Sequence, residues 1–363
     1  MSNKPNIIDK AYNWLDNRFQ LNDLVHFLQK KSVPKFRSSI WYYMGGIALV
    51  LFIIQVLSGI LLLMYYKGTE DQAFESVQFI ITKVHFGWLV RSVHSWSANL
   101  MVFFAFLHMF SVFFFKSFRQ PRELTWYTGF IMLLMCFGFG FSGYLLPWNE
   151  LSFFATKIGT DMVGQVPLVG HWMLRLLRGG EDVTGATLSR FYGIHVAVLP
   201  LIFTSLLTAH LIFIQRQGMH EPESWKNKAE SEKTYMPFFP NFILRDLLLW
   251  LIVLNLLAML AVYFPWELGH KANAFAPAPK GIRPEWYFLF MFQALKFIPG
   301  KIGPIDGELI GLALFGAAGL LWFLVPFWDR KNQSVQWNKK LNYIGIFVVM
   351  FIIVFTILGI ILE

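Results

Sequence analysis

Four of the nine histidines lie inside long apolar runs, where an ionisable side chain is costly and usually functional. His94 and His108 are 14 residues apart in one run, and His195 and His210 are 15 residues apart in another. Both spacings are close to four helical turns, so the two histidines of each run project from roughly the same side of their helix. At about 1.5 Å per residue they define two levels roughly 21 to 22 Å apart.

These levels pair His94 with His195 and His108 with His210, because the two runs cross the membrane in the same direction. Two imidazoles that face each other across a helical bundle suit a haem iron whose axial positions are both filled, and such a haem transfers electrons. Each histidine taken alone also fits a hydrogen bond between helices. Zinc would need four ligands and a proton relay would need carboxylates, and neither is present at these levels. The repeated spacing therefore favours two haems.

Glycines repeat the histidine spacing in two other apolar runs. Gly45 and Gly59 are 14 residues apart, and so are Gly129 and Gly143. A haem is a wide, flat plate, so the helices beside it need small residues where it passes. Close packing of membrane helices through glycine is the alternative explanation. The shared spacing favours clearance for haem.

The elements that must position these residues are membrane-spanning helices. Hydrophobic residues make up 56% of the 363 residues and charged residues only 15%. A spanning helix needs about 20 mostly apolar residues, and seven such runs occur, at 40–66, 92–115, 124–148, 191–215, 247–266, 309–328 and 341–362. We therefore expect an all-α integral membrane protein with seven transmembrane helices, of which the first four form a haem-binding bundle.

Charge orients this bundle and divides the chain. Segments 1–39, 116–123, 216–246 and 329–340 together carry 19 Lys and Arg but 10 Asp and Glu, whereas the remaining residues carry 12 of each sign. Because Lys and Arg accumulate in cytoplasmic loops, we expect a cytoplasmic N-terminus and an outer C-terminus in a bacterial inner membrane, with no need to invoke nucleic acid. The chain is expected to divide into three parts, which are an amphipathic surface segment (1–39), the four-helix bundle (40–215) and a C-terminal part with three helices (216–363).

Several motifs give the chain a resemblance to a known family over essentially its whole length. They are RSVHSWS at 91–97, GYLLPW at 143–148, TLSRFYGIH at 187–195 and PEWY at 284–287. With these motifs and the glycine pairs, the sequence resembles cytochrome b of the Rieske/cytochrome b (bc-type) quinol oxidoreductases. It is most similar to the photosynthetic form, with that form's two polypeptides fused. The resemblance implies two non-covalent b haems, each held by one of the histidine pairs.

The resemblance also implies two quinone sites. Quinol oxidation on the outer side would use Glu285 as the proton acceptor, with Tyr144 nearby and Pro284, Trp286 and Tyr287 as further binding residues. A second site near the inner haem would use Gln215, Arg216 and Asp246. Arg91 is a candidate partner for a propionate of the outer haem.

Three positions depart from the photosynthetic pattern. That form attaches an extra haem through a cysteine where this sequence has Tyr43, and the one cysteine of the chain, Cys136, lies in another run. We therefore expect no covalent c-type haem. This argument concerns covalent attachment alone and does not exclude a third haem that is bound non-covalently. Two arginines of that form are replaced by Ser95 and Ser111, so the propionate contacts must differ.

The implied activity is that of the electron-transfer subunit of a quinol:cytochrome c type reductase. Quinol is oxidised on the outer side, one electron leaves to a Rieske iron–sulfur protein, and the other crosses through the two haems to reduce quinone on the inner side. The implied partners are the Rieske protein, a c-type cytochrome, quinone, membrane lipid and a second copy of the chain. Two alternatives stay open: a di-haem membrane anchor of a quinone-linked dehydrogenase, and a transporter with a histidine proton relay.

Overall fold

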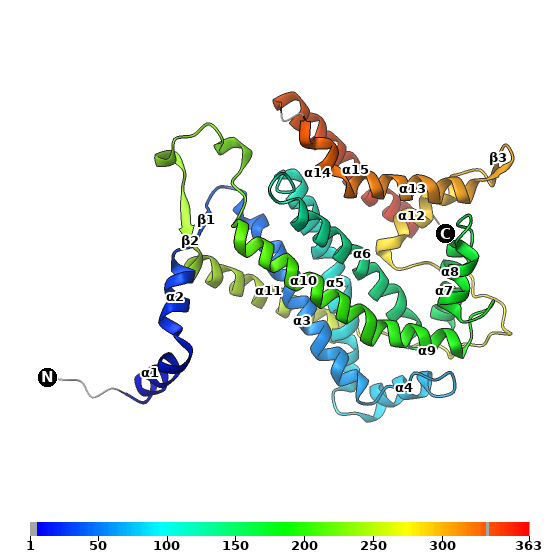
Figure 1. Cartoon of the computed structure of the whole chain (residues 1–363). Coiled ribbons are helices and arrows are strands. Elements are labelled where there is room, and N and C mark those ends of the chain that lie inside the picture. Colours follow the sequence, from blue (N-terminus) through cyan, green and yellow to red (C-terminus); the bar gives the residue numbers. More distant parts are fainter. Residues whose placement is uncertain (1–5, 332–333, 363) are drawn as a thin grey trace.

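Long helices dominate the computed structural model, which describes residues 6–331 and 334–362 (Figure 1). The α-helices are α1 (Ile7–Phe19), α2 (Leu21–Gln29), α3 (Met44–Leu63), α4 (Ala73–Lys83), α5 (Gly87–Phe114), α6 (Glu123–Leu145), α7 (Glu150–Gly164), α8 (Gly170–Arg178), α9 (Gly185–Gly193), α10 (Leu199–Gln217), α11 (Ile243–Tyr263), α12 (Trp286–Lys296), α13 (Gly307–Phe323), α14 (Val325–Trp328) and α15 (Val335–Ile361). The strands are β1 (Ser32–Pro34), β2 (Tyr235–Pro237), β3 (Lys301–Ile302) and β4 (Ile305–Asp306).

The predicted all-α membrane architecture is confirmed. Within the described residues, six helices are long and apolar enough to cross a membrane, at 39–63, 87–114, 123–145, 185–217, 238–263 and 335–361. The seventh predicted span is shorter than expected. Helix α13 has 17 residues and ends at Phe323, and α14 begins at Val325, directly before Pro326. Proline lacks the N–H that would continue the helix, which explains why residues 309–328 do not form one helix.

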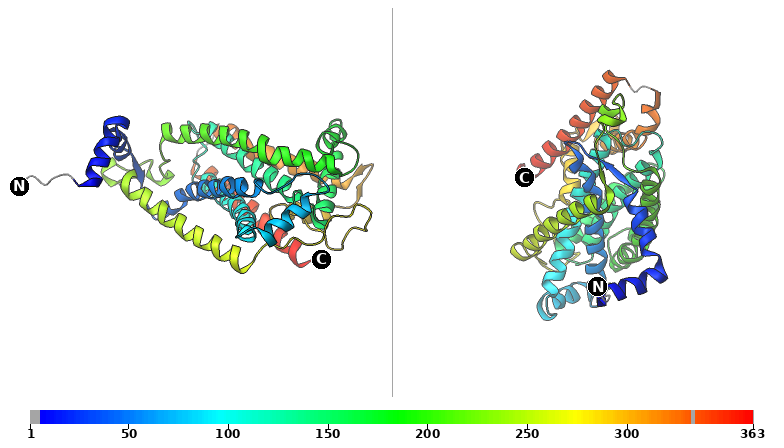
Figure 2. Two further views of the ribbon diagram at one scale, coloured as in Figure 1. Left: turned by 90° about the horizontal axis from the view of Figure 1, so that it is seen from below. Right: turned by 90° about the vertical axis from the view of Figure 1, so that its left-hand side faces the viewer.

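The core of the bundle lies between α3, α5, α6 and α10. Helix α3 packs along α5, and α6 packs along α10. Their buried residues form one apolar cluster with α11, whose members include Ile47, Leu51, Val102, Met132, Phe203 and Leu257. The end of α15 and the helix α1 lie on opposite sides of the molecule in Figure 1 and in the left view of Figure 2.

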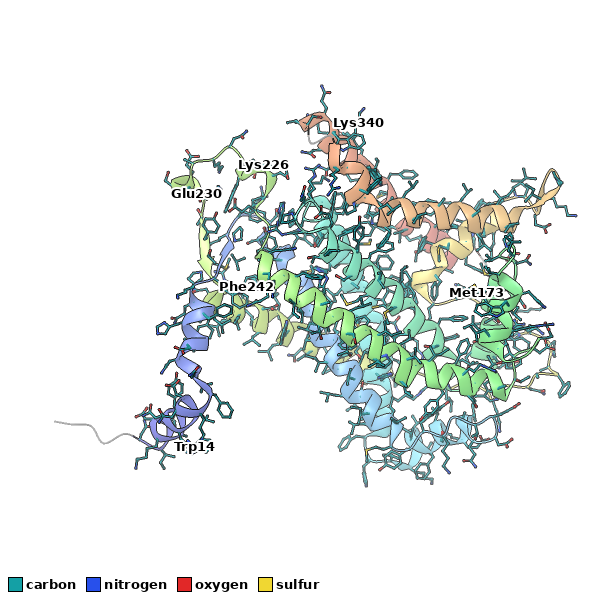
Figure 3. The ribbon with its side chains drawn as sticks, viewed as in Figure 1. Trp14, Met173, Lys226, Glu230, Phe242 and Lys340 are labelled. Atoms are coloured by element: carbon teal, nitrogen blue, oxygen red, sulfur yellow. The ribbon has the colours of Figure 1, made fainter. Side chains whose placement is uncertain are left out.

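Two faces of the bundle carry the connecting segments. We call one the basic face, which comprises residues 6–38, 115–122, 218–242 and 324–331. We call the other the PEWY face, which comprises residues 64–86, 146–184 and 264–306. Strands β1 and β2 pair on the basic face, with Val33 opposite Met236, and β3 pairs with β4 on the PEWY face. Helices α1 and α2 project from the basic face and expose Trp14 and Phe19 (Figure 3). Their place on a membrane surface stays a prediction.

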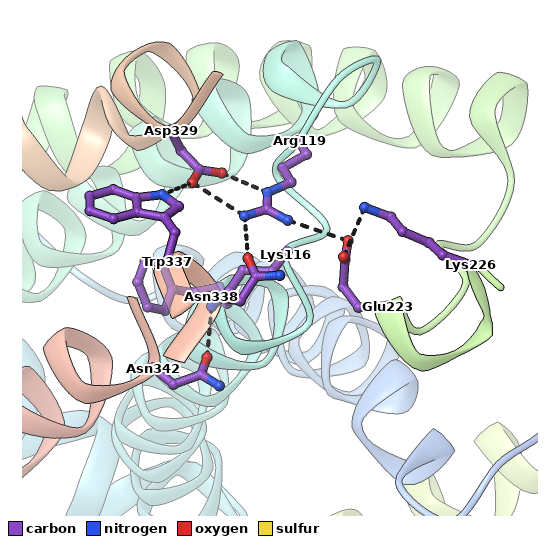
Figure 4. Close-up of polar contacts among 9 residues, drawn as sticks. Lys116, Arg119, Glu223, Lys226, Asp329, Trp337, Asn338 and Asn342 are labelled. Carbon is purple, nitrogen blue, oxygen red and sulfur yellow. Dashed lines mark hydrogen bonds and ion pairs between the residues drawn. The ribbon is translucent and has the colours of Figure 1, made fainter. Parts of the chain in front are cut away.

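A buried ionic network ties the C-terminal helices to the four-helix bundle on the basic face (Figure 4). Arg119 lies 2.6 Å from Asp329 through its Nε and donates to Asn338 at 2.6 Å, while Trp337 donates to Asp329 at 2.6 Å. The side chain of Asp329 is 1% exposed and that of Arg119 is 7% exposed. Burial, aided by the charge of Arg119, lowers the pKa of the neighbouring Lys116 to about 8.

We expect Asp329→Asn to destabilise the protein strongly. The change removes the nearer of two carboxylates that Arg119 contacts and leaves Glu223, 3.4 Å from the guanidinium. Breaking a buried ion pair typically costs about 3–5 kcal/mol, of which the remaining pair offsets a part. The measurement is thermal unfolding of the detergent-solubilised protein. Asp182→Asn is the control, because the Lys157–Asp182 pair is solvent-exposed at 3.8 Å and should contribute about 0–1 kcal/mol. Equal melting temperatures for the two variants would show that the network does not stabilise the fold.

Candidate functional site

The four histidines of the apolar runs form two facing pairs inside the bundle. The ring centroids of His94 and His195 are 6.4 Å apart, and those of His108 and His210 are also 6.4 Å apart. Two metal–imidazole bonds of about 2 Å, plus about 1.1 Å from each ring centre to its nitrogen, would separate two rings by about 6 Å. Each pair is therefore spaced to hold one metal ion between its imidazoles. The His94 pair lies nearer the PEWY face and the His108 pair nearer the basic face.

Each of the four predicted glycines faces one of these imidazoles. A Cβ built on the glycine would lie 3.3 Å or less from the Cε1 atom of the ring, at Gly45 against His108, Gly59 against His94, Gly129 against His210 and Gly143 against His195. The contact at Gly143 would be 2.6 Å, which no side chain tolerates without a shift. The glycines of α3 and α6 thus leave room for the imidazole rings themselves, and clearance for a haem stays a prediction.

Three of the histidines form a hydrogen bond between Nδ1 and the hydroxyl of a serine or threonine. Ser142 lies 3.1 Å from His195, and its hydroxyl donates to the Gly138 carbonyl, so its oxygen accepts from the imidazole. Ser58 engages His94 at 2.9 Å and Thr128 engages His210 at 3.0 Å in the same way. A hydrogen bond at Nδ1 fixes the ring and leaves Nε2 as the nitrogen for the metal.

Sequence reasoning missed these hydroxyls, although the signal was present. Each one directly precedes a predicted glycine, as in Ser58–Gly59, Thr128–Gly129 and Ser142–Gly143. The fourth glycine, Gly45, follows Met44, which has no hydroxyl. Its histidine, His108, is correspondingly the one whose Nδ1 has no partner among the described residues.

The unequal histidine spacings have a structural explanation. Residues Ile194–Val198 form a π-helical turn, in which Leu199 donates to the carbonyl of Ile194, five residues earlier. Pro200 follows directly and has no N–H to donate to Val196, which favours the wider turn. A π turn absorbs one extra residue within a helix. The 15-residue spacing of His195 and His210 therefore reaches the same two levels as the 14-residue spacing on α5.

A second site lies on the PEWY face. A cavity of about 460 Å³ is lined by four of the predicted residues, Tyr144, Pro284, Glu285 and Trp286, and by residues that sequence reasoning missed, including Trp96, Asn99, Phe103 and Trp266. Trp286 donates to Asn99 at 2.8 Å, which fixes the start of α12 against α5. Burial raises the pKa of the Glu285 carboxyl above its ordinary value. The cavity thus presents a carboxyl with a raised proton affinity among aromatic rings.

Two predicted residues lie differently from expectation. Tyr287 does not line the cavity, because its ring turns into the core and stacks on Phe137 at 5.9 Å. Arg91 is buried and donates to the carbonyls of Trp266 and Glu267. It therefore holds the segment that carries Trp266, one wall of the cavity.

The predicted residues on the basic face are not brought together. The carbonyl of Gln215 accepts from Lys31 at 3.2 Å, and Arg216 is exposed at the end of α10. Asp246 lies instead against α3, where a Cβ on Gly46 would be 2.5 Å from its carboxylate. Among the described residues, no hydrogen bond or ion pair joins Gln215 or Arg216 to Asp246.

The fold and these sites define a class: a multi-pass helical membrane protein whose bundle presents two stacked pairs of facing imidazoles. Comparison with known proteins identifies the family. The model for cytochrome b/b6/petB matches residues 28–218, and the model for cytochrome b(C-terminal)/b6/petD matches residues 271–362. The chain belongs to the cytochrome b family, and it is the cytochrome b subunit of a bc-type complex.

Individual relatives agree with this assignment. The chain is 48% identical over 349 residues to a cytochrome bc complex cytochrome b subunit of Chlorobaculum thiosulfatiphilum, a match that covers 96% of this chain and 80% of the relative. It is 44% identical to cytochrome b6 of Synechococcus sp. (strain RCC307), which covers 58% of this chain and 97% of the relative. A solved structure, described as a hyperthermophilic respiratory Complex III, is similar with a TM-score of 0.78 at 28% identity and covers 96% of this chain and 98% of that one.

If His94 and His195 hold a haem, we expect Ser142→Ala to raise its midpoint potential by an amount on the order of tens of mV. Losing the acceptor at Nδ1 makes His195 a weaker electron donor to the iron, which disfavours the oxidised state. The measurement is a spectroscopic redox titration. Ser205→Ala is the matched control, because Ser205 makes the same bond to a carbonyl of its own helix at 2.8 Å but contacts no histidine. Unchanged potentials in both variants would mean that Ser142 does not tune the ligand.

Proposed function

We propose that this chain carries electrons between two quinone sites through two non-covalent b haems, as the cytochrome b subunit of a quinol:cytochrome c or similar reductase. The observation that carries the proposal is the pair of imidazole sites, each with its rings 6.4 Å apart and facing glycines. His94 and His195 would hold one haem and His108 and His210 the other. Bound haem supplies a one-electron carrier at each level.

The chain's own residues would bind the quinol and accept a proton from it. Oxidation of one quinol releases two electrons and two protons. The cavity on the PEWY face would hold the quinol ring between aromatic side chains, with the Glu285 carboxylate as acceptor of one of the protons. One electron would leave to a Rieske iron–sulfur protein and the other would pass to the His94–His195 level and on to the His108–His210 level. At the basic face, quinone takes up two electrons and two protons to give quinol.

Orientation and partners belong to the same proposal. The excess of Lys and Arg on the basic face supports an orientation in which that face and the N-terminus would lie in the cytoplasm of a bacterium, and the C-terminus and the PEWY face would lie outside. The chain would act as a homodimer in the lipid bilayer, with a Rieske protein and a c-type cytochrome. The cavity around Glu285 favours this function over a di-haem anchor of a dehydrogenase, which has no need of a quinol-oxidising site on the PEWY face.

The test uses the purified complex. A reduced-minus-oxidised spectrum and solvent extraction should give two extractable b haems per chain and none bound covalently. Quinol should reduce the haems only together with the Rieske protein. Quinol oxidation that needs no Rieske protein would favour the dehydrogenase anchor, and the absence of b-haem bands would overturn the proposal.

A further inference from the structure

The imidazole of His220 has a buried nitrogen without a partner on the basic face. Its Nε2 makes no hydrogen bond among the described residues. His220 lies in the segment that follows α10 and belongs to neither of the two histidine pairs. A buried donor or acceptor without a partner is costly, so this nitrogen requires an explanation.

The groups around His220 come from the basic ends of all four bundle helices. The backbone of Phe115, at the end of α5, interacts with the imidazole. Tyr42, just before α3, donates its hydroxyl to the His220 carbonyl. Arg122, the residue before α6, faces the imidazole and donates to the carbonyl of Gln217, at the end of α10, at 3.1 Å. These contacts hold His220 over the basic end of the bundle.

His220 lies about two helical turns beyond the histidine pair nearer the basic face. Phe115 is seven residues after His108 on α5, and Gln217 is seven residues after His210 on α10. Seven residues are close to two turns, about 10 Å along the axis, and return to the same side of a helix. His220 is therefore above the side of α5 and α10 that carries the two imidazoles.

The charges that face His220 favour an anion. Arg122 and Lys226 are the cations, and Glu223 is the acid. Glu223 is already paired, with Lys226 at 2.8 Å and with the guanidinium of the ionic network (Figure 4). Arg122 forms no ion pair within 4 Å in the described part of the chain, and Glu221 acts on it from farther away. Arg122 thus leaves a positive charge beside the imidazole.

A haem between His108 and His210 would bring an anion to this place. Its two propionates lie on one edge of the plate, and a carboxylate buried in an apolar bundle is costly unless a donor or a cation accompanies it. This edge would therefore face the basic end, where His220 lies. Ser111, about one turn beyond His108, is no donor to a propionate, because its hydroxyl donates to the His108 carbonyl at 2.7 Å.

We propose that His220 donates from Nε2 to a propionate of the haem held by His108 and His210. An imidazole donates from Nε2 when it is protonated or in one of its neutral forms. The inference rests on the proposed function, because it needs a haem at this level. A buried water is the other species that could satisfy the nitrogen, and the experiment separates the two.

The experiment is a spectroscopic redox titration of the whole purified complex, which needs no turnover. His220→Phe keeps a ring and removes the donor, so the propionate charge is less neutralised and the oxidised, more positive iron is favoured. We expect the reduction equilibrium of this haem to shift roughly tenfold toward the oxidised form, a potential lower by about 59 mV for a one-electron couple. The haem at the His94 level should keep its potential, and His108→Leu identifies which signal belongs to which level.

Two further variants separate a hydrogen bond from a structural effect. His220→Gln keeps a donor in its amide, and its potential should stay near that of the wild type. His26→Phe is the matched control, because His26 is exposed on α2 of the same face and its replacement should leave both potentials unchanged.

Three results would overturn the inference. A wild-type potential in His220→Phe would leave water as the partner of Nε2. An equal shift in His26→Phe would show a general effect of the basic face. Equal changes in His220→Phe and His220→Gln, in potential or in haem content, would show that a donor does not matter. A wild-type complex without two b haems would instead refute the proposed function, so the two failures are distinguishable.

Discussion

Replacing His94 with leucine is expected to remove one of two b haems and to leave the other in place. Leucine fills the volume but offers no nitrogen to iron, so His195 alone cannot keep a haem with two axial ligands. His108 and His210 lie four turns away and should be unaffected. Total b-haem absorbance in the reduced-minus-oxidised spectrum should fall by about half, and the surviving haem should titrate at its wild-type potential.

The control for this prediction is His171→Leu. His171 lies on α8 and is exposed, and its Nε2 lies 3.9 Å from the Glu181 carboxylate, so this variant should keep both haems. His108→Leu should remove the other haem and gives a second, independent comparison. Full occupancy of both haems in His94→Leu would refute the pairing of levels. Low expression alone would not support it, because an unpaired ligand also destabilises the bundle.

The helices could be predicted because the membrane leaves little choice. Every backbone group in lipid must be satisfied internally, so about 20 apolar residues in a row form a helix regardless of side-chain detail. The seventh apolar run, which forms a shorter helix than the others, shows the limit of that rule. Residues 309–328 are apolar throughout, but the regular helix breaks at Pro326, because proline lacks the backbone N–H that would continue it. A hydropathy scale describes side chains and therefore does not indicate such a break. The short pairing of β1 with β2 joins segments about 200 residues apart and leaves no local pattern.

The two facing pairs of histidines could be predicted because histidines are rare at membrane depth and repeat at a fixed spacing. The hydroxyls of Ser58 and Ser142 escaped notice because serine is common in membrane helices, and its hydrogen bond to a histidine depends on packing between α3, α5, α6 and α10. The arrangement on the basic face could not be predicted either. Charged residues at helix ends are routine, so the sequence did not show that Asp246 lies against Gly46 of α3.

The ionic network of Figure 4 joins the two regions that the family models match separately. Arg119 lies in the first region and Asp329 in the second, 210 residues apart. The match to the cytochrome b6 relative covers 58% of this chain and 97% of the relative. Side-chain contacts such as Arg119–Asp329 therefore connect parts of the bundle that relatives do not all carry on one polypeptide.

Glu285→Gln is expected to slow quinol oxidation by about 10²–10⁴-fold while both haems stay in place. Glutamine keeps the size and the hydrogen bonding of glutamate but cannot take up a proton. Glu285 lines the cavity with Tyr144, and a positioned general base contributes a factor of this order. The measurement is steady-state quinol oxidation across pH, with haem spectra recorded on the same samples. Glu267→Gln is the control, because Glu267 lies on the same face with an exposed side chain outside the cavity lining.

The pH profile distinguishes a base from a structural carboxyl. Burial disfavours the charged form and raises the pKa of Glu285 above its ordinary value of 4.5. A base must be ionised to accept a proton, so the wild-type rate should fall as the pH falls through this raised pKa, and should be full above it. Glu285→Gln should lack that acidic limb. If the variant matched the wild type at every pH, Glu285 would be a wall of the cavity only, and water or a partner's side chain would have to accept the proton.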